Sequence, residues 1–437
     1  MKKSHKFLWL LCVIAACFAS CHHTSKTASS NEEQAVLSIN SSANTSCPYL
    51  TSNAMGVPVM SWVQQDSMHK MDMQGMSMEK KKRGGMNMPG MSMSGTGSVY
   101  YAIFSDHSKT FGKPMLIPTA MGAEIHGEDA PKILFQKNGH ILVVFAVKNP
   151  HPGNPYTGAV YYTQSFDNGK TWTTAQHIIK DTSSYDQRYF DMASLPDGKA
   201  AIIWLNNSKP QGSTLYFATL DGQRGISEPE IVAQHACQCC RTDILVDSSG
   251  KINIAWRDIY RDSIRDMMYA CSDNMGKSFS TPVRISADNW VVDGCPHTGP
   301  SMAINNEGLN FTWFTMGGGS GVYYCQKTGS EMIFSHRQSV NSLPSSRHPQ
   351  IVALPNNDLA IVWDGGVPYQ NQVNQRIGLQ MRGPSGLLLG TRYLTPDSVN
   401  ANFPVVRVLS NKAALVAYTE GREGMQQVKY RVISLQP

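Results

Sequence analysis

Sulfur is the unusual element of this sequence, which contains 23 Met and 10 Cys in 437 residues. Nine methionines and one histidine crowd into residues 68–93, mostly two or three positions apart: Met68, His69, Met71, Met73, Met76, Met78, Met86, Met88, Met91 and Met93. Their neighbours are Gly, Ser, Asn and Lys, so the segment cannot be an apolar core stripe. Thioether sulfur is a soft ligand that needs no deprotonation, and the segment therefore predicts copper binding as Cu(I). The alternative is an oxidation-prone, low-complexity loop without a metal.

Two cysteine motifs supply a second set of soft ligands. Cys237-x-Cys239-Cys240 and Cys295-x-His297 precede equivalent runs of the internal repeat described below, so we expect them to be neighbours. If the first motif is extended, Cys237 and Cys239 point to one side and Cys240 to the other. Thiolates and an imidazole favour a copper site or, less strongly, a zinc site. In an oxidising compartment Cys295 can instead form a disulfide with Cys239 or Cys240, and the spacing leaves both interpretations open.

The first residues resemble a bacterial lipoprotein signal. A basic start and an apolar run too short to span a bilayer lead to Phe18-Ala19-Ser20-Cys21, which is similar to a lipobox. We expect residues 1–20 to be a signal peptide, Cys21 to carry the lipid, and residues 21–45 to be a flexible tether. Ordinary cleavage with an unmodified Cys21 is the alternative. Lipidation predicts an extracytoplasmic location in the cell envelope, with the membrane and a metal ion or metal-handling protein as partners.

The charge balance argues against nucleic-acid binding. The formal net charge is +6, and three of the positive charges are Lys2, Lys3 and Lys6 in the expected signal peptide. No segment carries a basic stripe of the length that binds a nucleic-acid backbone, so we expect no nucleic-acid partner. Hydrophobic residues make up 41% of the chain and charged residues 16%, a composition that can bury a core.

An internal repeat of about 55 residues organises the rest of the chain. A buried-looking aromatic recurs in successive β-like runs: Trp62, Phe145, Trp204, Trp256, Trp313, Trp363 and Tyr418. Tight turns link these runs to their neighbours, which indicates antiparallel hairpins of short strands. Each unit supplies four strands, here A to D from the inside outwards, and radial repetition of such sheets predicts an all-β propeller over residues 46–437. Seven blades are favoured and six are the alternative, with Ala35–Ile39 completing the last blade.

One turn motif resembles the Asp-box repeat of sialidase-like propellers. Ser165, Asp167, Gly169, Thr171 and Trp172 match its Ser-x-Asp-x-Gly-x-Thr-Trp pattern completely, and residues 272–279 are a degraded copy. We expect the Asp to accept turn N–H groups, the Gly to take a left-handed conformation and the Trp to lie between blades. The motif therefore indicates a fold and assigns no chemistry.

The topology of a propeller places the unusual residues on one face. The D–A and B–C connections share a face, and the A–B and C–D turns share the opposite one. Both cysteine motifs lie in D–A connections, and residues 68–93 lie in a B–C loop. We therefore expect the two sets of soft ligands to share the loop-bearing face.

The resemblance also implies a glycan-directed alternative. Sialidase-like enzymes hold a substrate carboxylate with three arginines, because guanidinium groups bind carboxylates in a bidentate manner. The first of these arginines is missing here, where Ser46-Cys47-Pro48-Tyr49 stands in the corresponding place. Arg241, Arg257 and Arg347 lie at the expected loop face and leave an anion-binding or glycan-binding pocket open. We assign no catalytic residue. The main hypothesis is a copper-binding propeller for storage, delivery or tolerance. The alternatives are a glycoside hydrolase or glycan-binding propeller and a protein-interaction scaffold.

Overall fold

The chain folds into antiparallel strands wherever the structure, a computed structural model, describes it. The described residues are 34–65, 95–149, 157–179, 186–207, 212–329, 331–422 and 425–435. They contain no α-helix, only the 3-10 turn η3 (Gly127–Asp129). No helix in this part is long and apolar enough to cross a membrane. The strands are short and rich in β-branched and aromatic residues, the types that fit a pleated and half-buried surface.

Three sheets are antiparallel meanders of four consecutive strands. The first contains β16 (Asp243–Val246), β17 (Ile252–Arg257), β18 (Met267–Ser272) and β19 (Val283–Arg284). The second contains β20 (Ser301–Asn305), β21 (Gly308–Thr315), β22 (Gly321–Lys327) and β23 (Gln338–Asn341). The third contains β24 (Arg347–Ala353), β25 (Leu359–Tyr369), β26 (Gln372–Arg382) and β27 (Leu388–Tyr393). Tight turns between strands of this kind allow each strand to pair with the next one in the chain.

Two further sheets are larger variants of this meander. The five-stranded sheet contains β11 (Gln187–Ser194), β12 (Ala200–Asn206), β13 (Ser213–Asp221), β14 (Gly225–Ile226) and β15 (Glu230–Ala236). The nine-stranded sheet contains β2 (Thr45–Ser52), β3 (Pro58–Gln64), β4 (Thr96–Ser105), β5 (Thr110–Phe111), β6 (Met115–Glu124), β7 (Lys132–Phe135), β8 (Ile141–Lys148), β9 (Gly158–Ser165) and β10 (Gln176–His177). It consists of two meanders, because β6 pairs along β4 and meets β8 at the single position Ala123↔Val147.

The last sheet joins the two ends of the folded part. It contains β28 (Ala401–Ser410), β29 (Ala413–Arg422), β30 (Met425–Ser434) and β1 (Leu37–Ser38). Leu37 pairs with Tyr430 and Ser38 with Lys429, which confirms that the N-terminal run completes the last sheet. The folded part therefore includes residues that the sequence assigned to the tether.

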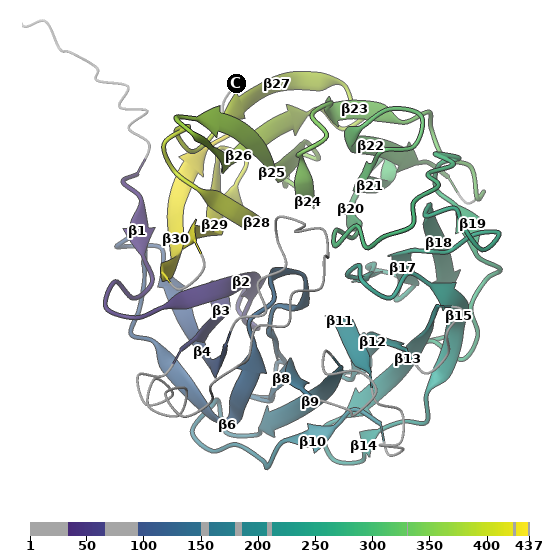
Figure 1. Ribbon diagram of the computed structural model, residues 1–437. Coiled ribbons are helices and arrows are strands. Elements are labelled where there is room, and N and C mark those ends of the chain that lie inside the picture. Colours follow the sequence, from purple (N-terminus) through teal and green to yellow (C-terminus); the bar gives the residue numbers. More distant parts are fainter. Residues whose placement is uncertain are drawn as a thin grey trace, which may run out of the picture. The chain divides into compact units, whose positions relative to one another are not determined.

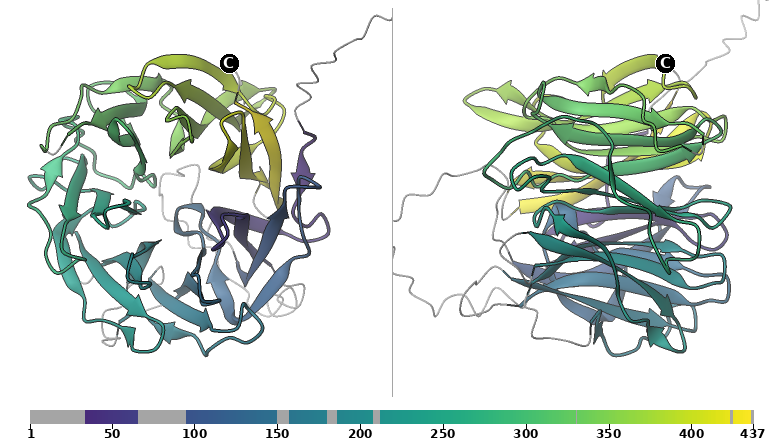
Figure 2. Two further views of the ribbon diagram at one scale, coloured as in Figure 1. Left: turned by 180° about the vertical axis from the view of Figure 1, so that it is seen from behind. Right: turned by 90° about the vertical axis from the view of Figure 1, so that its right-hand side faces the viewer.

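The sheets surround a common axis with one edge strand of each facing inwards. Of the labelled strands, β2, β11, β20, β24 and β28 lie nearest the centre (Figure 1). The same arrangement is seen from behind in the left view of Figure 2. This is the all-β, propeller-like architecture that the repeat predicted, and it brings the starts of the inner strands together.

The repeated aromatic residues hold the sheets together. All seven lie on the second strand of a meander and are at most 2% exposed. Their register is constant, since Trp62 pairs with Tyr100, Trp204 with Tyr216 and the others with the equivalent positions. Apolar side chains from neighbouring sheets meet around them in successive core clusters. Repetition of one buried aromatic per unit therefore marks where each sheet packs against the next.

The Asp-box turn between β9 and β10 has the expected geometry. The Asp167 carboxylate accepts the N–H groups of Lys170 (3.0 Å) and Thr171 (2.9 Å) and the Thr171 hydroxyl (2.6 Å). Gly169 has φ +86°, and its N–H donates to Ser165 Oγ at 2.8 Å. Trp172 lies edge-on to Tyr101 of the neighbouring meander at 6.4 Å. The motif is a capped turn that also contributes to the core.

Candidate functional site

The starts of the inner strands are irregular in a recurring way. Cys47, Tyr189, His348 and Phe403 all have φ near +50°, at the point where the register of their strand shifts. Non-glycine residues with this φ are strained, and such strain gathers where a fold must aim side chains at one place. The bulges turn the chain at the loop-bearing end of the central axis. The candidate ligands lie at this end.

Three cysteines converge between β15 and β16, and we call Cys237, Cys239 and Cys240 the three-sulfur group. Cys237 Sγ lies 3.5 Å from Cys239 Sγ and 3.9 Å from Cys240 Sγ. All three sulfurs lie within 4.8 Å of one another, and the side chains are at most 4% exposed. The motif is a turn rather than the extended run considered above, so Cys240 joins the other two instead of pointing away. A hydrogen bond of 2.8 Å from Cys237 N–H to the Arg257 carbonyl fixes the start of the turn.

The three thiols differ in acidity because of the hydrogen bonds between them and because of their burial. Contacts with Cys239 and Cys240 hold the pKa of Cys237 well below its usual range, and Arg265 Nη1 lies 3.4 Å from this sulfur. The contact with Cys237 raises the pKa of Cys239, and burial raises the pKa of Cys240. The surroundings therefore favour ionisation of Cys237 over ionisation of Cys239 and Cys240. A soft ion that binds all three releases the remaining protons.

Cys295 and His297 lie beside this group, as the equivalent positions of the two motifs predicted. Cys295 packs against the three sulfurs, and contacts with Cys239 and then His297 lower its pKa to about 5. Burial lowers the pKa of His297, but the sulfurs of Cys295 and Cys240 outweigh it, so the pKa is raised overall. Each of these two side chains therefore favours the charged form of the other.

His126 is a residue at this site that the sequence reasoning missed. It precedes η3, and its ring centroid lies 6.0 Å from that of His297 and 5.7 Å from that of Tyr189. Burial lowers its pKa to about 4, so the imidazole is neutral at pH 7. The only available signal was its position, because it lies in a D–A connection like the two cysteine motifs.

The disulfide that the spacing left open as an alternative is not formed among the described residues. All seven cysteines there are free thiols: Cys47, Cys237, Cys239, Cys240, Cys271, Cys295 and Cys325. Cys271 and Cys325 lie in a separate buried core cluster. Cys21 and the methionine segment 68–93 fall outside the described residues, so the structure places neither of them.

The three predicted arginines are engaged with the protein itself. The Arg241 guanidinium pairs with the buried Glu128 carboxylate and also donates to the Pro349 carbonyl. Arg257 is 1% exposed and donates to the carbonyls of Arg265, Thr298 and Phe314. Arg347 donates to carbonyls of its own loop and stacks over Phe314 at 3.7 Å. An anion must therefore compete with existing partners at each of them.

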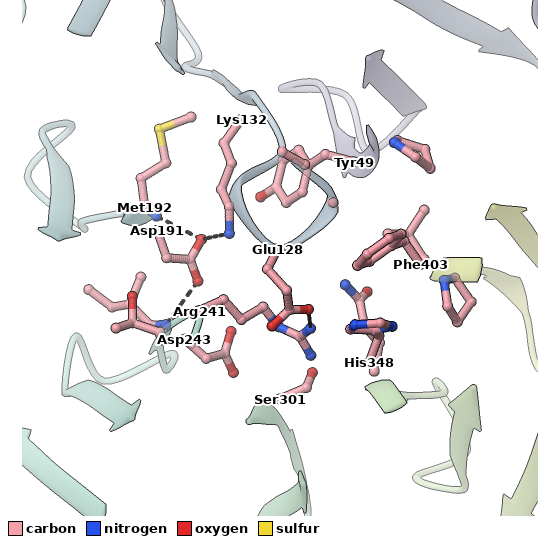
Figure 3. Close-up of a pocket in the computed structure, with 18 residues that line it drawn as sticks. Tyr49, Glu128, Lys132, Asp191, Met192, Arg241, Asp243, Ser301, His348 and Phe403 are labelled. Carbon is pink, nitrogen blue, oxygen red and sulfur yellow. Dashed lines mark hydrogen bonds and ion pairs between the residues drawn. The ribbon is translucent and has the colours of Figure 1, made fainter. Parts of the chain in front are cut away.

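A polar cavity of about 160 Å³ lies on the axis among the inner strands (Figure 3). Equivalent positions of the inner strands line it: Tyr49, Lys132, Asp191, Asp243, Ser301, Gln350 and Val405. Lys132 Nζ lies 2.7 Å from Asp191 Oδ1, and the other Asp191 oxygen accepts the Ile244 N–H at 3.0 Å. Burial raises the pKa of Asp243, which lies beside Asp191. The paired Glu128 and Arg241 are also among the lining residues, and in Figure 3 they lie between the Lys132–Asp191 pair and His348.

Comparison with known proteins shows a shared fold. No family model and no curated protein matches the sequence, so the Asp-box resemblance stays at the level of the motif. A polysaccharide lyase of family PL25, an ulvan lyase, matches with a TM-score of 0.56 at 10% identity, over 90% of this chain and 94% of the lyase. A protein of unknown function from Dyadobacter fermentans matches with a TM-score of 0.52 at 12% identity, over 92% of this chain and 99% of that one. The sialidase NanB from Streptococcus pneumoniae matches with a TM-score of 0.46 at 9% identity, over 89% and 85%.

The lyase and the sialidase among these solved structures are glycan-processing enzymes. At identities this low a structural match shows the fold alone, and one fold supports many activities. An activity must therefore be inferred from the side chains of this protein.

Proposed function

We propose that this protein binds a soft metal ion, with Cu(I) as the best match, through the three-sulfur group. The observation that supports this proposal most directly is that three buried sulfur atoms lie within 4.8 Å of one another. Three sulfurs bound to one ion at about 2.3 Å in a trigonal arrangement lie roughly 4 Å apart. The distances of 3.5 and 3.9 Å from Cys237 are close to that value. Little rearrangement is therefore needed to bind an ion.

Ligand type and charge both support a soft monovalent ion. Thiolates select Cu(I), zinc and iron–sulfur clusters over hard cations. Three thiolates around Cu(I) leave a net negative charge in a buried place, which requires compensation. Arg265, 3.4 Å from Cys237 Sγ, supplies one positive charge, and the buried Arg257 supplies another nearby.

The test is a Cu(I) competition titration of the purified chain against a chromophoric Cu(I) chelator, without oxygen. Loss of a supporting partner alone lowers metal affinity by about 10- to 100-fold, so Cys237→Ser/Cys240→Ser is expected to exceed that loss. Cys271→Ala/Cys325→Ala, which removes two buried cysteines elsewhere, is the matched control and is expected to bind like the original chain. Equal competition by both variants would contradict the proposal.

The methionine segment 68–93 is proposed as a second, weaker set of Cu(I) ligands. Thioethers are neutral, so a site built from them does not depend on deprotonation as the thiolates do. Deleting residues 68–93 is expected to reduce the number of bound Cu(I) ions while the tightest site is retained. An unchanged stoichiometry after the deletion would exclude a role for the segment.

A glycan-directed pocket is the second candidate, favoured by the matches to polysaccharide lyases with TM-scores above 0.5. The axial cavity provides carboxyl, amine and hydroxyl groups of the kind that bind sugars. Incubation with ulvan, followed by ultraviolet absorbance of unsaturated uronates, tests for lyase activity. Release of sialic acid from a fluorogenic substrate tests for sialidase activity. Turnover that is lost in Asp243→Asn would establish this candidate, and no turnover in either assay would remove it.

We also infer seven blades and a lipid anchor. The nine-stranded sheet contains two meanders, so counting meanders instead of hydrogen-bonded sheets gives seven units. Anchoring at Cys21 follows from the lipobox-like motif and implies a location in the cell envelope outside the cytoplasm. Partition of the expressed protein into detergent, lost on Cys21→Ser, tests the anchor.

A further inference from the structure

The three-sulfur group is not the only set of metal-binding side chains at this end of the axis. Cys239 precedes β16, Cys295 and His297 precede β20, and His126 precedes η3, so three inner-strand connections contribute. Cys295 contacts both Cys239 and His297, and the rings of His297 and His126 are 6.0 Å apart. Two sulfurs and two imidazoles therefore follow one another in space, from Cys239 of the three-sulfur group through Cys295 and His297 to His126.

The histidine nitrogens lack the partners that buried imidazoles normally have. Nδ1 of His126 and both ring nitrogens of His297 are inaccessible to solvent and have no hydrogen bond of good geometry, although Cys295 lies beside the His297 ring. A buried polar atom without a partner loses its bonds to water and gains none in return, so such atoms call for an explanation. Three of them within one pair of neighbouring histidines point to a ligand between the rings.

The separation of the rings fits coordination of one ion. Metal–nitrogen bonds of about 2.0 Å place the centroids of two imidazoles on one ion roughly 5 to 6 Å apart. The observed 6.0 Å lies at the upper end of that range. The neighbouring Glu128 is not available as a ligand, because its two oxygens accept hydrogen bonds from Arg241 and the Gly299 N–H.

We propose that Cys239, Cys295, His126 and His297 form a second metal site, of Cys₂His₂ composition, that binds a borderline divalent ion such as Zn²⁺. Two thiolates and two imidazoles are a common tetrahedral set for Zn²⁺, whereas three sulfurs without nitrogen suit Cu(I). Cys239 belongs to both sets, so its sulfur bridges the two ions when both are bound. The two sites differ in preference, and the divalent site can fail without affecting the proposed Cu(I) site.

Binding at this second site requires a contraction of the loops. Among the described residues, only the three cysteines have ligand atoms all within 4.8 Å of one another. The segment before β20 carries Cys295 and His297 and has almost no regular secondary structure, and His297 has φ +50°. Binding therefore requires rotation of the two imidazoles and movement of this segment, whose residues 295–300 belong to no sheet.

The experiment uses Co²⁺ as a spectroscopic substitute for Zn²⁺ in the Cys237→Ser/Cys240→Ser chain. This variant breaks the three-sulfur group and keeps all four proposed ligands. We expect one equivalent of Co²⁺ with thiolate-to-cobalt charge transfer and the intense visible bands of tetrahedral cobalt, displaced by Zn²⁺. Adding His126→Asn and His297→Asn is expected to abolish these bands. His336→Asn, at an exposed histidine, is the matched control and is expected to leave them unchanged.

The outcomes separate this site from the proposed Cu(I) site. No tetrahedral cobalt spectrum in the double-serine chain, or a spectrum that persists without the two histidines, overturns the Cys₂His₂ site. In the chain that retains all cysteines, the His126→Asn/His297→Asn variant keeps the three-sulfur group. Its Cu(I) affinity is therefore expected to stay within about tenfold of that of the original chain. Circular dichroism checks folding of each variant, and His126→Gln alone replaces the pair if the double substitution unfolds the chain.

Discussion

At the scale of single residues, Asp129 gives the structure a pH dependence that can be measured. Burial raises its pKa to about 7, while one oxygen accepts the Tyr189 N–H at 2.9 Å and the other has no partner. The unfolded carboxyl ionises near its usual value of about 3.9, so the folded chain holds the proton between these values. Stability therefore falls as the pH rises from about 4 to about 7 and is level above that range.

Asp129→Asn is expected to flatten this fall, because the amide cannot ionise and its oxygen keeps the bond from Tyr189. At pH 8 the free energy of unfolding of the variant should exceed that of the original chain by on the order of a few kcal/mol. The cost of burying the unpartnered amide N–H group that the substitution introduces reduces this gain. Denaturant unfolding between pH 4 and pH 8 measures the effect. Asp262→Asn, at an exposed site, should leave the pH dependence as it was, and a similar slope in both variants would reject the assignment.

Residue types identified the sulfur ligands, but spacing did not identify the whole site. All five candidate ligands of the two cysteine motifs, Cys237, Cys239, Cys240, Cys295 and His297, were predicted because soft ligands in equivalent connections of a repeat must lie near one another. The convergence of Cys240 depends on a turn fixed by a long-range bond to Arg257, which no local pattern encodes. His126 was missed for a similar reason, since its approach to His297 is created only when the sheets form around the axis.

At the scale of elements, the Asp-box turn makes a testable contribution to stability. The hydroxyl and N–H of Thr171, followed by Ser165, lower the pKa of Asp167 to about 2. These bonds favour the ionised side chain, so their contribution is complete above the unfolded pKa of about 3.9 and is lost as the pH falls through about 2. Asp167→Ala is expected to lower the melting temperature at pH 7 and to make little difference near pH 2. Asp106→Ala, in a turn where the carboxylate meets only the exposed Lys109, is the control.

The elements themselves were largely predictable, because their signals are local. A buried aromatic in the second strand and a glycine or asparagine turn before it specify each hairpin within one unit. The merging of two meanders into the nine-stranded sheet was not predicted, since it depends on β6 reaching β8 at Ala123↔Val147. The start of the folded part was placed at residue 46 because the preceding residues are polar, although β1 already belongs to a sheet.

At the scale of the whole molecule, the first strand closes the arrangement by pairing with the last. Without β1, strand β30 would present a row of unpaired backbone groups, and such exposed edges invite aggregation. Ile39 supports this closure, because its side chain is 8% exposed in the core cluster beneath β30 and its N–H donates to the Val428 carbonyl at 3.0 Å. The stability of the last sheet therefore depends on residues almost 400 positions away in the chain.

Ile39→Ala is expected to lower the free energy of unfolding by about 2 to 3 kcal/mol, the lower part of the range for such truncations in a core, because the site lies at an edge. The same truncation at Val36, which is 44% exposed, should change it by less than about 0.5 kcal/mol. Because the last sheet opens first, proteolysis of Ile39→Ala under native conditions should cut within β28–β30 before any other sheet is cleaved. Cleavage that begins elsewhere, with the last sheet intact, would show that the fold does not depend on its terminal strand. The proposed metal sites provide an independent check, since their candidate ligands lie near the starts of the inner strands. Loss of an outer strand should leave the metal stoichiometry unchanged until the last sheet itself unfolds.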